Sequence, residues 1–234
     1  MRWLLLAALC GCGRIDFDVS VDGDSTSDSS TDVGLLVHLA FDSDGLLLDR
    51  VGNNVTCFGP CPTSAPGRVG DGAAAFDGTQ CLSIADSPAF HTPTTLTVTA
   101  WGNAVTPTQQ YAQLVSRPFG GPTQNTNSYE LWVGPTNLWV SVLMNTVLVS
   151  NPVPPQTWHH TALVFDGVTE TLYLDGQFVD SSAAMPLQFT ADPTTVGCDI
   201  DFGSAVFHIT GMIDDVRIYA RALSVNEVQT IVAL

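Results

Sequence analysis

The chain has 234 residues and a formal net charge of −16, with 23 aspartates and glutamates against seven arginines and no lysine. This balance excludes the basic surface that nucleic-acid binding needs, and it disfavours direct contact with anionic membranes. The length is sufficient for one β-sandwich with a sizeable core, and a metal cation is a natural counter-charge for so many aspartates.

The first twelve residues are typical of an export signal. An apolar run follows the first arginine and is too short to span a bilayer. It ends in Leu-Cys-Gly-Cys at residues 9–12, which is similar to a bacterial lipobox with Cys12 as the acylated residue. We therefore expect residues 1–12 to be a lipoprotein-type signal peptide. We then expect the chain to be exported. It is either lipid-anchored in the cell envelope, at the outer membrane, or secreted.

Residues 13–34 contain six aspartates and five serines but almost no large apolar side chains. Such a segment cannot bury enough surface to offset the entropy of ordering it. We expect a disordered acidic linker between the anchor and a folded domain.

From residue 35 onward, short segments rich in β-branched and aromatic residues alternate with turns. Asp77-Gly78 and Asp175-Gly176 are two-residue hairpin signals, and residues 158–180 predict a three-stranded meander. Ser224 and Glu227 form a capping box that predicts a short helix at the C-terminus. These patterns predict an all-β domain over residues 35–234, a two-sheet antiparallel jelly-roll β-sandwich. The predicted strands are 35–41, 73–76, 81–85, 96–105, 111–117, 129–133, 138–142, 158–165, 170–174, 177–180, 194–198 and 206–219.

Two tryptophans indicate a ligand-binding surface. If residues 134–137 form a hairpin loop, Trp132 lies opposite Trp139 on one face, with Glu130 beside them. Indole faces stack on the C–H surfaces of sugars, so these three residues are candidate glycan ligands, together with the loops at 118–127 and 199–204. The alternative is that both rings simply pack in the interior.

Adjacent His159 and His160 suggest a metal or catalytic pair. Neighbouring strand residues point to opposite faces, so the two histidines cannot chelate one ion. We expect His160 to be a buried histidine with its hydrogen bonds satisfied.

Four cysteines follow the signal segment, and an exported chain favours disulfides over zinc. Three connectivities are open. Cys57 and Cys61 flank a Gly-Pro turn and can close a local loop, which leaves Cys81 and Cys198 to pair and connect distant strands.

Four stretches, taken in order, resemble the LamG-like jellyroll family of the concanavalin A-like lectin/glucanase superfamily. They are GRVGDGAAAFDGTQCLSIADSP, LTVTAWGNAV, QTWHHTALVFDGVTETLYLDGQFV and GMIDDVRIYARALSVNEV. The resemblance spans about residues 35–234 and implies two stacked antiparallel sheets. It does not imply one activity, because such modules bind glycans or proteins or serve as structural appendages.

Some relatives hold a structural ion after the first strand, where Asp42 lies. Asp214 is predicted among apolar neighbours, so its carboxylate needs either backbone amides or a cation as partner. We expect a structural calcium ion with Asp42 and either Asp214 or Asp215 as carboxylate ligands.

Hydrolysis is disfavoured because the glucanase pattern Glu-x-Asp-x-x-Glu is missing and the three glutamates lie far apart in sequence. The sequence therefore favours a non-catalytic cell-surface module that binds a glycan or an extracellular protein. The alternatives are a purely structural or adhesion domain, or a degenerate glycoside hydrolase.

Overall fold

The computed structural model describes residues 32–234, apart from residues 92–93 and 109. The expected signal peptide, the acylation site Cys12 and most of the linker lie outside the described residues. Within the described part, no helix is long and apolar enough to cross a membrane.

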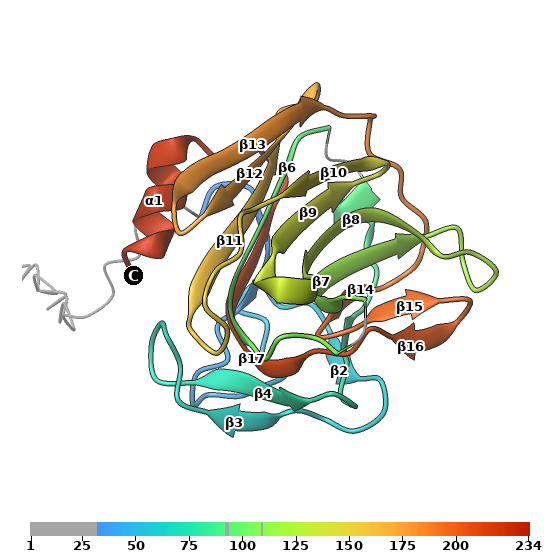
Figure 1. The fold of residues 1–234 in the computed structure, drawn as a ribbon. Coiled ribbons are helices and arrows are strands. Elements are labelled where there is room, and N and C mark those ends of the chain that lie inside the picture. The colour runs from blue at the N-terminus through green and yellow to red at the C-terminus, as the bar shows by residue number, and fades with distance from the viewer. Residues whose placement is uncertain (1–31, 92–93, 109) are drawn as a thin grey trace, which may run out of the picture.

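Two antiparallel sheets stack face to face, as the sequence predicted for a jelly-roll sandwich (Figure 1). The first sheet has the order β13-β12-β11-β6-β17-β4-β3, with β1 also beside β17. The second has the order β10-β9-β8-β7-β14-β5-β2, and β15 and β16 form a separate hairpin. The strands of the first sheet are β1 (Leu35–Leu39), β3 (Thr63–Ala65), β4 (Ala73–Asp77), β6 (Leu96–Ala104), β11 (His159–Phe165), β12 (Thr169–Leu174), β13 (Gln177–Ala183) and β17 (Thr210–Tyr219). The remaining strands are β2 (Val55–Cys57), β5 (Leu82–Ile84), β7 (Ala112–Phe119), β8 (Thr126–Val133), β9 (Trp139–Leu143), β10 (Thr146–Val149), β14 (Thr194–Val196), β15 (Asp199–Asp201) and β16 (Ser204–Val206). The helical elements are η1 (Pro88–His91), η2 (Pro135–Asn137) and α1 (Val225–Val232).

Strand β11 is buried on both faces, which explains its nearly continuous apolar sequence. Leu163 and Phe165 join the core between the sheets, whereas Ala162 and Val164 join a second cluster under α1. Figure 1 shows α1 against this sheet. The helix begins with the predicted capping box between Ser224 and Glu227, and it buries its apolar side on the sheet.

The meander from β11 to β13 follows the predicted turns. Asp166 accepts hydrogen bonds from the backbone N–H groups of Val168 and Thr169, which fixes the first turn. Asp175 and Gly176 both have positive φ, 50° and 72°, as a type I′ hairpin requires. The expected strand at 206–219 is divided, because β16 ends at Val206 and β17 begins at Thr210.

Both predicted disulfides are present, Cys57–Cys61 and Cys81–Cys198. The second joins the ends of β5 and β14, which are hydrogen-bonded neighbours with Leu82 opposite Val196. It therefore connects adjacent strands of one sheet across a long stretch of sequence.

The predicted register of the β8–β9 hairpin is wrong by one residue. Trp139 lies opposite Val133, and Trp132 lies opposite Val140. The turn is longer than expected because Thr136 and Asn137 both adopt positive φ, 61° and 56°, within η2. A one-residue slip reverses the face of every side chain in a strand, so Trp139 enters the core, where it is 2% exposed.

Candidate functional site

A hydrogen-bonded polar network lies on the outer face of the second sheet, the face that points away from the first sheet. Glu130 accepts hydrogen bonds from Gln113 Nε2 at 2.6 Å and Asn127 Nδ2 at 2.8 Å. Asn127 Nδ2 also donates to Asp199 Oδ2 at 2.9 Å, and Ser116 Oγ donates to Asp199 Oδ1 at 2.6 Å. These five residues, Glu130, Gln113, Asn127, Ser116 and Asp199, are called the Glu130 network below.

Strands β7 and β8 present this network because β7 is irregular. Glu130 lies opposite Ser116, and Trp132 lies opposite Gln113. Gln113 and Ser116 are three residues apart and would face opposite sides of a regular strand. A bulge between Gln113 and Val115 restores them to one face. Simple alternation of the sequence could not have found this arrangement.

Burial makes two carboxyl groups of this site weaker acids than usual. Desolvation raises the pKa of Glu130 to about 7, and the nearby negative charge of Asp199 adds to the shift. The hydrogen bonds from Gln113 and Asn127 oppose it. Burial and Asp199 likewise raise the pKa of Asp201 to about 6. Glu130 therefore changes charge near neutral pH.

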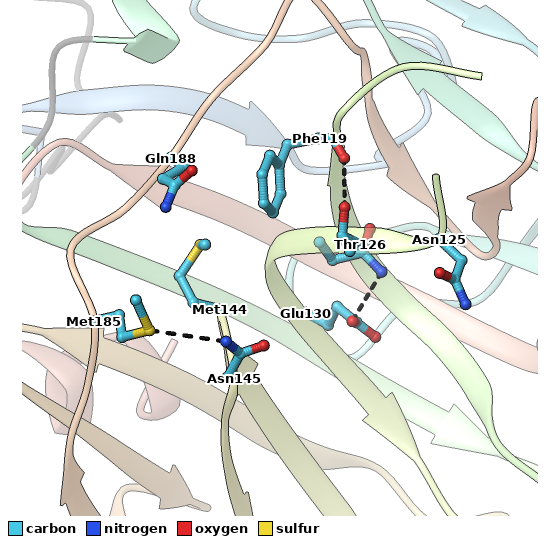
Figure 2. A pocket seen from close by; sticks show the side chains of 9 residues that line it. Phe119, Asn125, Thr126, Glu130, Met144, Asn145, Met185 and Gln188 are labelled. Atoms are coloured by element: carbon cyan, nitrogen blue, oxygen red, sulfur yellow. Dashed lines mark hydrogen bonds between the residues drawn. The ribbon is translucent and has the colours of Figure 1, made fainter. Parts of the chain in front are cut away.

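A cavity of about 320 Å³ opens beside Glu130. It lies between the start of β8, the β9–β10 turn and the segment that follows β13, and its walls combine amide, hydroxyl, thioether and aromatic groups (Figure 2). Phe119, Met144 and Gln188 surround a shared space in this view. The lining residues are Phe119, Asn125, Thr126, Asn127, Glu130, Met144, Asn145, Met185 and Gln188.

Backbone and side-chain contacts hold the cavity walls together. Thr126 Oγ1 donates to the Phe119 carbonyl at 2.7 Å, and Asn145 Nδ2 contacts Met185 Sδ at 3.7 Å. Ser128 connects two walls, since its carbonyl accepts from Met144 N at 3.0 Å and its hydroxyl donates to the Gln188 carbonyl. The segment around residues 185–188 carries no strand pattern, so its role was not visible in the sequence.

Trp132 stands on the same face as Glu130, two residues further along β8, and is half-buried. Its ring lies 4.8 Å from the ring of Tyr111, which lies 4.1 Å from that of Phe207. The outer face thus carries an aromatic row that begins two residues along β8 from Glu130. Of the three predicted glycan ligands, Glu130 and Trp132 share this face and Trp139 does not.

The two predicted binding loops meet at the rim of this face. Phe202 N, in the β15–β16 turn, donates to the Gln124 carbonyl in the β7–β8 loop at 2.9 Å. The Phe202 side chain is 62% exposed at this junction, and Figure 1 shows both loops projecting on one side.

The two histidines of β11 do face opposite sides, as predicted. His159 Nδ1 lies 2.8 Å from Asp175 Oδ2. His160 is fully buried, and its ring contacts that of Trp101, 5.4 Å away. The expectation of satisfied hydrogen bonds was wrong, because neither ring nitrogen has a partner among the described residues. Burial lowers the pKa of His160 to about 4.

The three predicted calcium ligands have different surroundings. Asp215 is taken up by Arg217 Nη2 at 3.0 Å and His38 Nε2 at 2.8 Å, so it does not fit the role of a ligand. Asp42 Oδ2 accepts from Arg50 at 2.6 Å. Asp214 Oδ2 accepts from the backbone N–H groups of Arg68 and Val69, but its buried Oδ1 has no partner in the described structure.

A glycine-rich turn at residues 67–72 packs closely against Asp42 and Asp214, and its backbone N–H groups donate to both, from Asp71 to Asp42 Oδ1 at 2.8 Å and from Arg68 and Val69 to Asp214 Oδ2. A Cβ on Gly67 would lie 2.1 Å from the Gly72 carbonyl oxygen and 3.0 Å from Asp214 Oδ2. One on Gly70 would lie 2.1 Å from Asp42 Oδ1. Among the described residues, no cluster of three or more His, Cys, Asp or Glu could hold a metal. An ion here would therefore depend on carbonyl oxygens as well as the two carboxylates.

The fold and this outer face define a lectin-like β-sandwich. The chain belongs to the concanavalin A-like lectin/glucanases superfamily, whose family model matches residues 76–229. No curated protein matches the sequence.

Several solved structures share the fold at low sequence identity. Domain 4 of AbnA, a GH43 extracellular arabinanase from Geobacillus stearothermophilus in complex with arabinotriose, is 21% identical, with a TM-score of 0.66 over 85% of this chain and 98% of that one. The CBM40 of the Ruminococcus gnavus IT-sialidase, bound to α2,3-sialyllactose, is 16% identical, with a TM-score of 0.55 over 68% and 95%. The botulinum neurotoxin serotype D binding domain is 11% identical, with a TM-score of 0.67 over 88% of this chain and 52% of that one.

Proposed function

We propose that this protein is a non-catalytic glycan-binding module whose binding face is the outer face of the second sheet. The observation that carries the proposal is the cavity beside Glu130, on the same face as the half-buried Trp132 two residues along β8. A sugar needs hydrogen-bonding groups for its hydroxyls and an apolar surface for its C–H faces, and this face offers both. The arabinotriose and sialyllactose complexes of two structural relatives support a glycan as the ligand class.

Hydrolysis is the weaker alternative, although two carboxylates meet here. A glycosidase pair must reach the scissile bond from both sides. Glu130 lines the cavity, but Asp199 is 2% exposed. Both Asp199 oxygens accept hydrogen bonds, from Ser116 and Ile200 N on one side and Asn127 on the other. Asp199 therefore supports the network and does not act as a nucleophile or base.

A protein partner is the second candidate, since one toxin relative was solved in complex with rat synaptotagmin II. The exposed Phe202 at the rim suits such a contact. In either case, we propose that the module is exported and held at the cell envelope through Cys12 and the acidic linker. We also propose a structural calcium ion at Asp42 and Asp214.

A glycan array probed with the full chain, with and without calcium, tests the proposed function. We expect binding to a defined set of oligosaccharides that is weakened in Trp132→Ala. Binding that is unchanged in Trp132→Ala would move the site elsewhere. Turnover of any β-glucan would overturn the non-catalytic assignment.

A further inference from the structure

The cavity beside Glu130 has a one-sided charge. Among the described residues that line it, Glu130 is the one ionisable side chain, and the others are amides, a hydroxyl, thioethers and a phenyl ring. Asp199 shares the donor Asn127 Nδ2 with Glu130, and the negative charges of Asp199 and Asp201 both raise the pKa of Glu130. A ligand group that enters this cavity meets only negative or neutral partners.

The arginine of β7 does not supply a positive charge to this cavity. Arg117 is fully buried, and its Nη2 lies 2.5 Å from Asp86 Oδ1. The same nitrogen donates to the Thr190 carbonyl at 3.2 Å, and the guanidinium also lies over the Phe90 ring. Arginine is the side chain that recognises carboxylates and sulfates in pairs of hydrogen bonds, and here it is committed elsewhere.

We infer, resting on the proposed function above, that the Glu130 cavity accepts an uncharged sugar residue and rejects glycans that carry a carboxylate or sulfate at that residue. An anion placed there would lose its hydration beside Glu130 and gain no cation in return, which is strongly unfavourable. Above about pH 7, where Glu130 is ionised, its like charge acts as a repulsive specificity element. Of the two sugars bound by the relatives named above, the chemistry favours the class of arabinotriose over that of sialyllactose.

The remaining lining groups suit a neutral ring. Asn125, Asn145 and Gln188 carry amides that can donate and accept at once, as sugar hydroxyls require. Phe119, Met144 and Met185 provide the apolar wall. The volume of about 320 Å³ is at the lower end of small-molecule sites, so it suits a terminal sugar better than a long chain.

The test is run at pH 8, where Glu130 is ionised, and uses matched glycan pairs attached through their reducing ends, each pair differing in a terminal carboxylate or sulfate. Lactose with 3′-sulfated lactose is one pair, and arabinotriose is included among the neutral probes. The full chain is compared with Gln188→Lys, which places a cation at the cavity, and with Gln177→Lys. The latter makes the same charge change at an exposed position on β13 of the other sheet.

We expect the wild-type chain to bind neutral members only. Gln188→Lys should gain binding to acidic members by about tenfold or more, whereas Gln177→Lys should not. Wild-type binding to acidic members as strong as to neutral ones would overturn this inference and leave the glycan-binding proposal intact. Equal gains in the two lysine variants would also overturn it, since net charge and not the cavity would then decide. Silence across all probes would contradict the proposed function itself.

Discussion

Glu130 and Asp199 accept hydrogen bonds from the same nitrogen, Asn127 Nδ2, at 2.8 and 2.9 Å. Two carboxylates that share one donor beneath a cavity repel each other, and one of them takes up a proton more readily as a result. This relationship places the ionisable group of the proposed binding face on Glu130, whose charge changes near neutral pH.

The stability of the fold should report the protonation of Glu130. Its pKa is raised from 4.5 to about 7, so the folded state binds more protons than the unfolded state between these values. The stabilisation from this proton is complete below pH 4.5 and is lost as pH rises through 7. Urea unfolding of wild type and Glu130→Gln should show a difference that changes by up to about 3 kcal/mol across this window. Glu170 titrates with the same sign, so the comparison of the two chains isolates Glu130. A difference that is constant with pH would contradict the assignment.

The two tryptophans of the β8–β9 hairpin should behave in opposite ways. Trp139→Ala removes a ring from the core and should lower the free energy of unfolding by about 3–5 kcal/mol. Trp132→Ala removes a half-buried ring that contacts Tyr111 and should cost only about 1 kcal/mol. Glycan binding should fall about tenfold in Trp132→Ala. Thermal unfolding together with calorimetry measures both, and equal stability losses would contradict the observed register.

His160 should make the fold sensitive to acid. Its folded pKa of about 4 lies below the ordinary value of 6.5, so the unfolded state binds the extra proton between these values. Stability should fall by up to about 3 kcal/mol as pH drops from 6.5 to 4. Leucine has no nitrogen to desolvate, so His160→Leu should remove this dependence. His159→Leu is the control, since His159 lies on the other face. Identical pH profiles for wild type and His160→Leu would contradict this reading.

The two disulfides should contribute differently to the free energy of unfolding because they close loops of very different length. Cys81–Cys198 spans 117 residues of sequence and Cys57–Cys61 spans four. On the chain-entropy account, replacing the first pair by alanines should cost about 5 kcal/mol and the second about 2 kcal/mol. Denaturant unfolding of the two double variants measures both, and the reverse order would show that the long loop stays compact when unfolded.

Calcium should raise the melting temperature if Asp42 and Asp214 hold an ion. The shift should disappear in Asp214→Asn and persist in Asp44→Asn, which changes a neighbouring exposed carboxylate. Melting temperatures that are equal in calcium and in EDTA would refute the calcium proposal.

The sequence predicted the sandwich, the meander turns, the helix cap and both disulfides, because each depends on local chemistry or on cysteine spacing. The proposed binding face was only partly predictable. Thr136 and Asn137 adopt positive φ, which residues other than glycine rarely do. The turn length and the face of Trp139 could therefore not be foreseen. The bulge that joins Gln113 to Ser116, and the approach of Asp199 to Asn127, are tertiary features without a local signal.

The most direct test of the binding face is an NMR titration of the ¹⁵N-labelled full chain with a neutral glycan identified on the array. We predict that the Trp132 indole N–H and the backbone amides of residues 125–130, 144–145, 185, 187 and 188 shift together and saturate at one affinity. Shifts confined to α1 or β13, on the other sheet, would contradict the account.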